Sequence, residues 1–120
     1  MNELAILYDY CVQKNGATET FPFGEDVLVW KVGGKMFALM RLNEVPVRLN
    51  LKCDPEKAIE LRERYDAILP GYHMNKKLWN TVIVDGRLPM PLVFSMIDDS
   101  YRLIVDSLPK TERLRLSGDV

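Results

Sequence analysis

The clearest structural signal in this sequence is a β-hairpin, which is predicted by the stretch Val27-Leu28-Val29-Trp30-Lys31-Val32-Gly33-Gly34-Lys35-Met36-Phe37-Ala38-Leu39-Met40-Arg41-Leu42. Two runs rich in β-branched, aliphatic and aromatic residues flank Gly33-Gly34, a two-residue loop that suits a primed turn. Cross-strand pairs of such residues stabilise a sheet. The register predicted from this turn is Trp30 with Phe37, Leu28 with Leu39, and Val29 with Ala38.

Both faces of this hairpin are largely apolar, which sets a packing requirement on the rest of the chain. One face has to pack on helices, and the other needs a further cover, a ligand or a partner chain. One prediction is therefore a homodimer or heterocomplex that buries either the opposite face or the set Val27, Val29, Ala38 and Met40.

The remaining elements follow from periodicity and from helix start and stop signals. Apolar spacing predicts helices over 3–15 and over 54–65, and a last helix that follows Pro89 and Pro91 and runs to about residue 108. Extended segments are expected at 18–23, 47–52 (with its polar residues exposed to water) and 79–84, and a loop at 68–71. The order α-β-β-β-β-α-β-α predicts an α+β domain over 1–109, a mostly antiparallel sheet with helices chiefly on one face, and a polar, mobile tail over 110–120.

Composition bounds the class of protein. The 120 residues carry a net charge of −1, but residues 27–84 hold ten Lys or Arg against six Asp or Glu. A basic middle between acidic ends can form a one-sided patch, or can be neutralised once the ends pack beside it. No apolar run approaches the roughly 20 residues of a membrane helix, and residues 1–4 show no secretion signal, so we expect a cytoplasmic protein.

The stretch 70–82 is the candidate binding segment, because aromatic, amide and basic side chains alternate there. Aromatic faces can stack on bases, lysines can neutralise phosphates, and amides can both donate and accept hydrogen bonds. The candidate residues are Tyr72, His73, Asn75, Lys76, Lys77, Trp79 and Asn80. Structural roles are the alternative: Trp79 in the core, Asn75 holding a turn, and the two lysines in a solvated loop.

The sequence contains no nucleophile elbow, phosphate loop, dinucleotide fingerprint or zinc-protease motif, which favours a protein that is not an enzyme and needs no cofactor. Cys11 and Cys53 are isolated thiols without metal-ligand spacing, so no metal site is expected.

The chain resembles the MmcQ/YjbR family of small bacterial proteins. The matching pieces, in chain order, are 21–24, 31–39, 51–56, 61–65, 70–82 and 100–105. The resemblance implies a fold similar to CyaY and to secretion chaperones, and a DNA-binding protein with a double-wing motif. The wings would be β-hairpins such as the one at Gly33-Gly34, with phosphate contacts from Lys31, Lys35, Lys52, Lys76 and Lys77. A protein-binding or chaperone-like adaptor that uses an apolar sheet face is the alternative.

Overall fold

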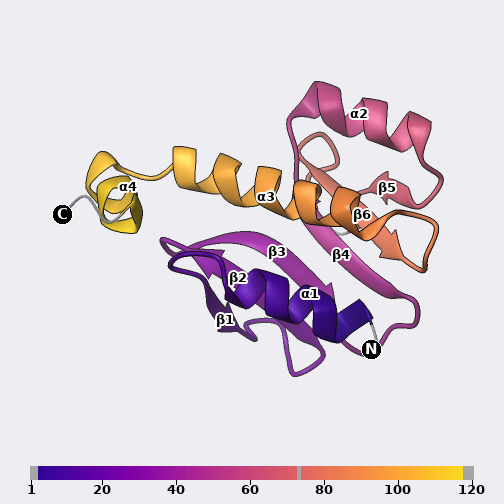
Figure 1. The fold of residues 1–120 in the computed structure, drawn as a ribbon, viewed down its shortest axis with the longest axis horizontal. Coiled ribbons are helices and arrows are strands. Elements are labelled where there is room, and N and C mark those ends of the chain that lie inside the picture. The colour runs from indigo at the N-terminus through magenta and orange to yellow at the C-terminus, as the bar shows by residue number, and fades with distance from the viewer. Residues whose placement is uncertain (1–2, 73, 118–120) are drawn as a thin grey trace.

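The fold is α+β, as predicted, with one antiparallel sheet in the strand order β1-β2-β3-β4-β6-β5 (Figure 1). The structure is a computed structural model that describes residues 3–72 and 74–117. Its strands are β1 Thr18–Thr20, β2 Val27–Val32, β3 Lys35–Arg41, β4 Val47–Lys52, β5 Ile68–Pro70 and β6 Trp79–Val84. Its helices are α1 Glu3–Val12, α2 Pro55–Arg64, α3 Met90–Asp106 and α4 Lys110–Ser117.

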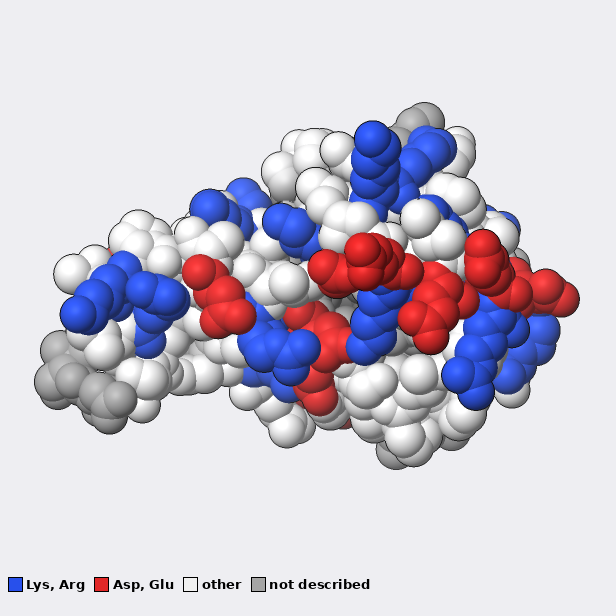
Figure 2. Space-filling view, turned by 90° about the horizontal axis from the view of Figure 1, so that it is seen from above, with Lys and Arg blue, Asp and Glu red and all other residues white. Residues whose placement is uncertain are grey.

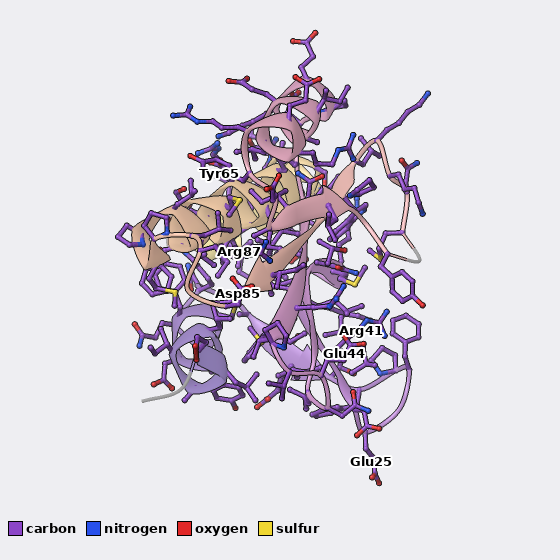
Figure 3. All side chains as sticks on the ribbon, turned by 90° about the vertical axis from the view of Figure 1, so that its right-hand side faces the viewer. Glu25, Arg41, Glu44, Tyr65, Asp85 and Arg87 are labelled. Atoms are coloured by element: carbon purple, nitrogen blue, oxygen red, sulfur yellow. The ribbon has the colours of Figure 1, made fainter. Side chains whose placement is uncertain are left out.

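The two faces of the sheet are covered differently. Figure 3 shows α1 and α3 on one side of the sheet and loops on the other, which we call the helix-free face. The main hydrophobic core lies on the helix side, where Trp30 and Phe37 are fully buried with Ile97 of α3. On the helix-free face, Val29 and Leu39 are also buried, although they lie outside that core.

A β-bulge makes the predicted hairpin register wrong beyond the turn. Val32 pairs with Lys35 around Gly33 and Gly34, both with positive φ, as a primed turn requires. The register then shifts between Trp30 and Lys31, so the observed pairs are Trp30 with Ala38, Val29 with Leu39, and Leu28 with Met40. The extra residue is Phe37, whose ring packs edge-on against Tyr101 of α3.

Because of this bulge, the apolar surface predicted from the sequence is also wrong. Ala38 and Met40 belong to the core on the helix side, whereas Val29 pairs with Leu39 on the opposite face. The set Val27, Val29, Ala38 and Met40 therefore does not form one surface.

Two further segments differ from expectation. The predicted loop at 68–71 contains the edge strand β5, because Ile68 and Leu69 pair with β6. The segment expected to be a mobile tail forms α4 over Lys110–Ser117 instead, whereas 118–120 lie outside the described residues. This helix is docked: a side chain at Gly16 would collide with Leu116, and the Asn15 amide donates to the Leu116 carbonyl.

Helices α1 and α3 are joined by a clamp around Tyr10. Its ring stacks on Phe94 with centroids 4.0 Å apart, and its hydroxyl donates to Asp98 at 2.7 Å. Lys14 forms an ion pair with the same carboxylate. Burial, together with the hydrogen bond to Asp98, raises the pKa of Tyr10 to about 12.

Replacing Ile97 with alanine should lower the free energy of unfolding by about 2–5 kcal/mol, because it leaves a cavity in the core. Ile59 is the matched control: it also lies on a helix, but its residue is 50% exposed against 0% for Ile97. Ile59→Ala should change stability by less than about 0.5 kcal/mol. Urea denaturation measures both, and equal losses would contradict the described core.

Tyr10→Phe should destabilise the protein at neutral pH and progressively less at alkaline pH. A raised pKa means that the folded state favours the neutral phenol, so its contribution is complete below the ordinary pKa of 10.0 and is lost as the pH rises to about 12. Urea midpoints of both proteins at a series of pH values test this. A stability difference that stays constant up to pH 12 would refute the role of the Tyr10 hydroxyl.

Candidate functional site on the helix-free face

Four basic side chains lie on the helix-free face, because successive side chains of a strand point to opposite faces of the sheet. Arg41 pairs with Arg48 and lies two residues from Leu39, so both arginines share the face of Leu39. By the same alternation Lys31 and Lys52 lie on this face. Among the described strands the one acidic residue is Glu19, which pairs with Trp30 and accepts a hydrogen bond from Tyr8 of α1, on the helix side. The strand positions of the helix-free face therefore carry positive charge alone.

A buried polar pair anchors the loop that crosses this face. Asn50 and Thr81 are each 2% exposed on neighbouring strands, and the Thr81 hydroxyl donates to Asn50 Oδ1 at 2.6 Å. The Tyr72 amide donates to Thr81 Oγ1 at 2.9 Å, and Asn50 Nδ2 donates to the Tyr72 carbonyl at 3.3 Å. The prediction that Asn50 faces water is wrong, because the loop over 71–78 covers it and takes up its hydrogen bonds.

A groove lies between this loop and the turn over 21–26. Its volume is about 320 Å³. The residues that line it are Phe23, Val27, Met36, Leu39, Arg41, Tyr72 and Met74. The aromatic residues at its sides are open to solvent, with Phe23 66% and Tyr72 54% exposed. The Arg41 guanidinium carbon lies 5.2 Å from the centre of the Tyr72 ring, within the range of a cation–π contact.

The loop is held at both ends by main-chain contacts. Gly71 donates to the Trp79 carbonyl at 2.9 Å, and a Cβ at position 71 would come within 2.8 Å of Trp79. Asn75 closes the turn: its carbonyl accepts from Trp79 N–H at 2.9 Å, and its side chain accepts from Lys77 N–H at the same distance. Arg62 of α2 donates to the Lys76 carbonyl at 2.7 Å. The backbone that carries Tyr72 is thus fixed.

Some of the predicted site residues lie on the helix-free face, and others have structural roles instead. Tyr72, Lys31 and Lys52 lie on the helix-free face, and the half-buried Trp79 pairs with Lys52 there. Asn75 holds its turn, as the structural alternative stated, and the buried Asn80 donates to the Ala58 carbonyl and accepts from Arg62.

The remaining lysines do not gather at the groove. Lys35 is on the helix side, with its ammonium 3.4 Å from the Ser107 hydroxyl, and the Lys76 ammonium turns back to the Gly71 carbonyl. Lys77 is exposed on the loop. His73 lies outside the described residues.

Sequence reasoning missed the residues that build the groove. Phe23, Arg41 and Met74 come from three separate segments, and Asn50 and Thr81 lie beneath them. The one available signal was Arg41 itself, a charged residue that follows the apolar run 36–40 at the end of β3. Its side of the sheet could not be assigned without the bulge.

The basic middle of the chain is not one continuous patch. On the side seen in Figure 2, Lys and Arg are interleaved with Asp and Glu. On the helices, Lys57 and Arg102 both pair with Asp99, at 2.7 and 2.9 Å. Both of these cations thus share one acidic partner, whereas Lys31, Arg41 and Lys52 on the helix-free face form no ion pair with an acidic side chain of the described residues.

The two thiols are poorly suited to nucleophilic chemistry. Both are buried, and burial raises the pKa of Cys53 and raises that of Cys11 to about 12. Within residues 3–72 and 74–117, no cluster of His, Cys, Asp and Glu has the arrangement of a metal site. Over the same ranges, no helix has the length and apolar character needed to cross a membrane.

The amino-acid sequence is similar to those of several bacterial proteins. The YjbR family model matches residues 12–103. The chain is 42% identical over 97 residues to the uncharacterised protein YbdF of Escherichia coli O157:H7, covering 80% of this chain and 79% of YbdF. It is 34% identical over 107 residues to the uncharacterised protein YjbR of E. coli K12, covering 89% and 91%.

Solved structures agree with the fold. The crystal structure of Deinococcus radiodurans protein DR2400, with a DUF419 domain, matches with a TM-score of 0.91 and 40% identity, over 98% of this chain and 89% of the other. A Pseudomonas syringae protein, solved as a crystal structure, matches with a TM-score of 0.73 and 29% identity, over 87% and 99%.

Thr81→Val should release the loop over 71–78 while leaving the side-chain volume nearly unchanged. It leaves Asn50 Oδ1 and the Tyr72 amide without their partner, at about 1–3 kcal/mol for each group. Thr18→Val, at an exposed strand position, is the matched control. Hydrogen exchange should show the Tyr72 amide losing protection in the first variant alone; unchanged protection there would exclude the anchoring role of Thr81.

Proposed function

This chain belongs to the YjbR family, and we propose that it is a non-enzymatic nucleic-acid-binding protein whose contact surface is the helix-free face. The observation that carries the proposal is the set of four basic strand residues on that face, with no acidic strand residue among them. Phosphate contacts from Lys and Arg supply most of the affinity in nucleic-acid binding.

The spacing of these charges suits an extended polyanion. Arg48 and Lys52 are four residues apart on one strand, which is about 13 Å at the usual strand rise. Arg41 lies beside Arg48 on the next strand, and Lys31 one strand further. Such a distribution matches several phosphates along a chain better than a single small anion.

The available charge is not lost to internal ion pairs. Arg48 approaches Glu44 at 3.4 Å, and both side chains are about 40% exposed, so the pair is weak and screened by salt. Within the described parts of the chain, Lys31, Arg41 and Lys52 form no ion pair with an acidic side chain. The proposed surface leaves out Lys35 at the hairpin tip, because it faces the end of α3.

A protein partner on the same face is the second candidate. Phe23 and Tyr72 are large exposed apolar groups beside the groove, and exposed apolar patches mark protein interfaces as well as ligand sites. A complex formed through these residues, a homodimer included, would depend little on salt. Salt dependence therefore separates the two candidates.

The test is fluorescence-anisotropy binding to a short labelled duplex and to a matching single strand at several salt concentrations. The double variant Lys31→Gln/Lys52→Gln should weaken binding and reduce the slope of log affinity against log salt by about 1–2. The control Lys35→Gln/Lys110→Gln makes the same change in net charge at exposed lysines off this face and should leave the slope unchanged.

Equal weakening by both variants would show that net charge matters and the helix-free face does not. Absence of binding to either probe at low salt would overturn the proposal. A dimer or heterocomplex that persists at high salt, and that is lost on Phe23→Ser, would then support the protein partner.

A further inference from the structure

We infer that the groove beside Arg41 and Tyr72 accepts one unpaired nucleobase, so that the protein binds single-stranded nucleic acid in preference to duplex. This inference rests on the proposed function and adds the class of nucleic acid. It comes from a feature that charge does not explain: an apolar, aromatic-sided hollow that lies beside the basic strand residues and includes Arg41 in its lining.

The groove has the size and chemistry of a site for one flat group. Its volume of about 320 Å³ is at the lower end of the roughly 300–1,000 Å³ typical of small-ligand sites. Leu39, Val27 and Met36 give it an apolar lining, and the exposed rings of Phe23 and Tyr72 offer surfaces on which a base can stack.

Arg41 supplies the charge that a nucleotide requires next to its base. Its guanidinium lies against the Tyr72 ring, which orients a planar fork of donors that can take a phosphate or a base edge. Figure 3 shows Arg41 on the helix-free side of the sheet, with Glu25 extending away from it. An aromatic surface and a cation therefore lie side by side, as stacking and phosphate binding together require.

The main chain that carries both aromatic residues is fixed before any ligand arrives. The main chain of Tyr72 is bonded to Asn50 and Thr81 of the sheet, at its carbonyl and its amide respectively. Phe23 lies in a tight turn, in which Gly24 N–H donates to the Phe21 carbonyl and Val27 N–H to the Gly24 carbonyl, both at 3.3 Å. A preformed site loses less conformational entropy on binding.

A base inside a duplex cannot use this groove, because its faces are already stacked on neighbouring bases. Entry requires the base to be unpaired or flipped out, at a cost that a single strand avoids. In a single strand, one base can enter while the phosphates on either side reach Arg48, Lys52 and Lys31. The groove thus favours single-stranded over duplex nucleic acid, and the surrounding charges supply affinity for the phosphates of either form.

The experiment compares three labelled probes: short oligothymidylate, an abasic phosphodiester strand of the same length and charge, and the oligothymidylate–oligoadenylate duplex. The thymidylate strand should bind about tenfold tighter than the abasic strand, as expected for stacking of one base. Tyr72→Leu should remove this difference and Tyr72→Phe should keep it. Phe21→Ala, at an exposed aromatic residue near Leu4 and Tyr8 and outside the groove, should keep it too.

Each outcome separates this inference from the proposed function. Equal, salt-dependent binding of the thymidylate and abasic strands, still weakened by Lys31→Gln/Lys52→Gln, would overturn base binding and leave the phosphate-binding surface in place. Tighter binding of the duplex would overturn the inference in the same way. Failure of all three probes to bind would refute both. Urea midpoints of the Tyr72 variants within error of the parent protein confirm that any loss arises at the groove.

Discussion

The β-bulge in the central hairpin determines what the two faces of this protein are made of. The extra residue is Phe37 of β3, which has no partner on β2 because Trp30 pairs with Ala38 and Lys31 pairs with Met36. Because side chains alternate along a strand, one extra residue reverses the side on which the following residues lie. Phe37 and Ala38 both reach the core, whereas Leu39 and Arg41 emerge on the helix-free face. Without the bulge, Arg41 would point into the core beneath the helices.

The two faces solve the same packing problem in different ways. On the helix side, α1 and α3 bury large apolar residues, and the Tyr10 clamp fixes the helices to each other. On the opposite side, two loops cover part of the sheet, and the Asn50–Thr81 pair bonds one of them to the strands. Loops cover less area than helices, so a hollow remains between them. That hollow is the groove.

Electrostatics follow the same division. The helices carry acids beside their lysines and arginines, as in the ion pairs of Asp99, whereas the strands of the helix-free face contribute basic residues. A net charge of −1 for the whole chain therefore conceals four basic residues at strand positions of the helix-free face, with no acidic residue at the strand positions of that face. The similarity to DR2400 over 98% of this chain indicates that the arrangement of elements is a property of the fold.

The sequence by itself determined the fold class, the family and, to within one residue, the limits of β2, β3, β4, β6 and α2. The two-glycine turn, the proline and acid at the start of α2, and the alternation in β4 are local signals, and local backbone preferences decide them. It also identified Tyr72, Lys31 and Lys52 as candidates, because exposed polar and aromatic residues are recognisable without a partner. Tertiary structure alone decided the bulge, the edge strand β5, the docking of α4 and the burial of Asn50. Each of these depends on contacts between residues far apart in the chain. The groove needs residues from the turn over 21–26, from β2 and β3, and from the loop over 71–78, and only packing brings them to one place.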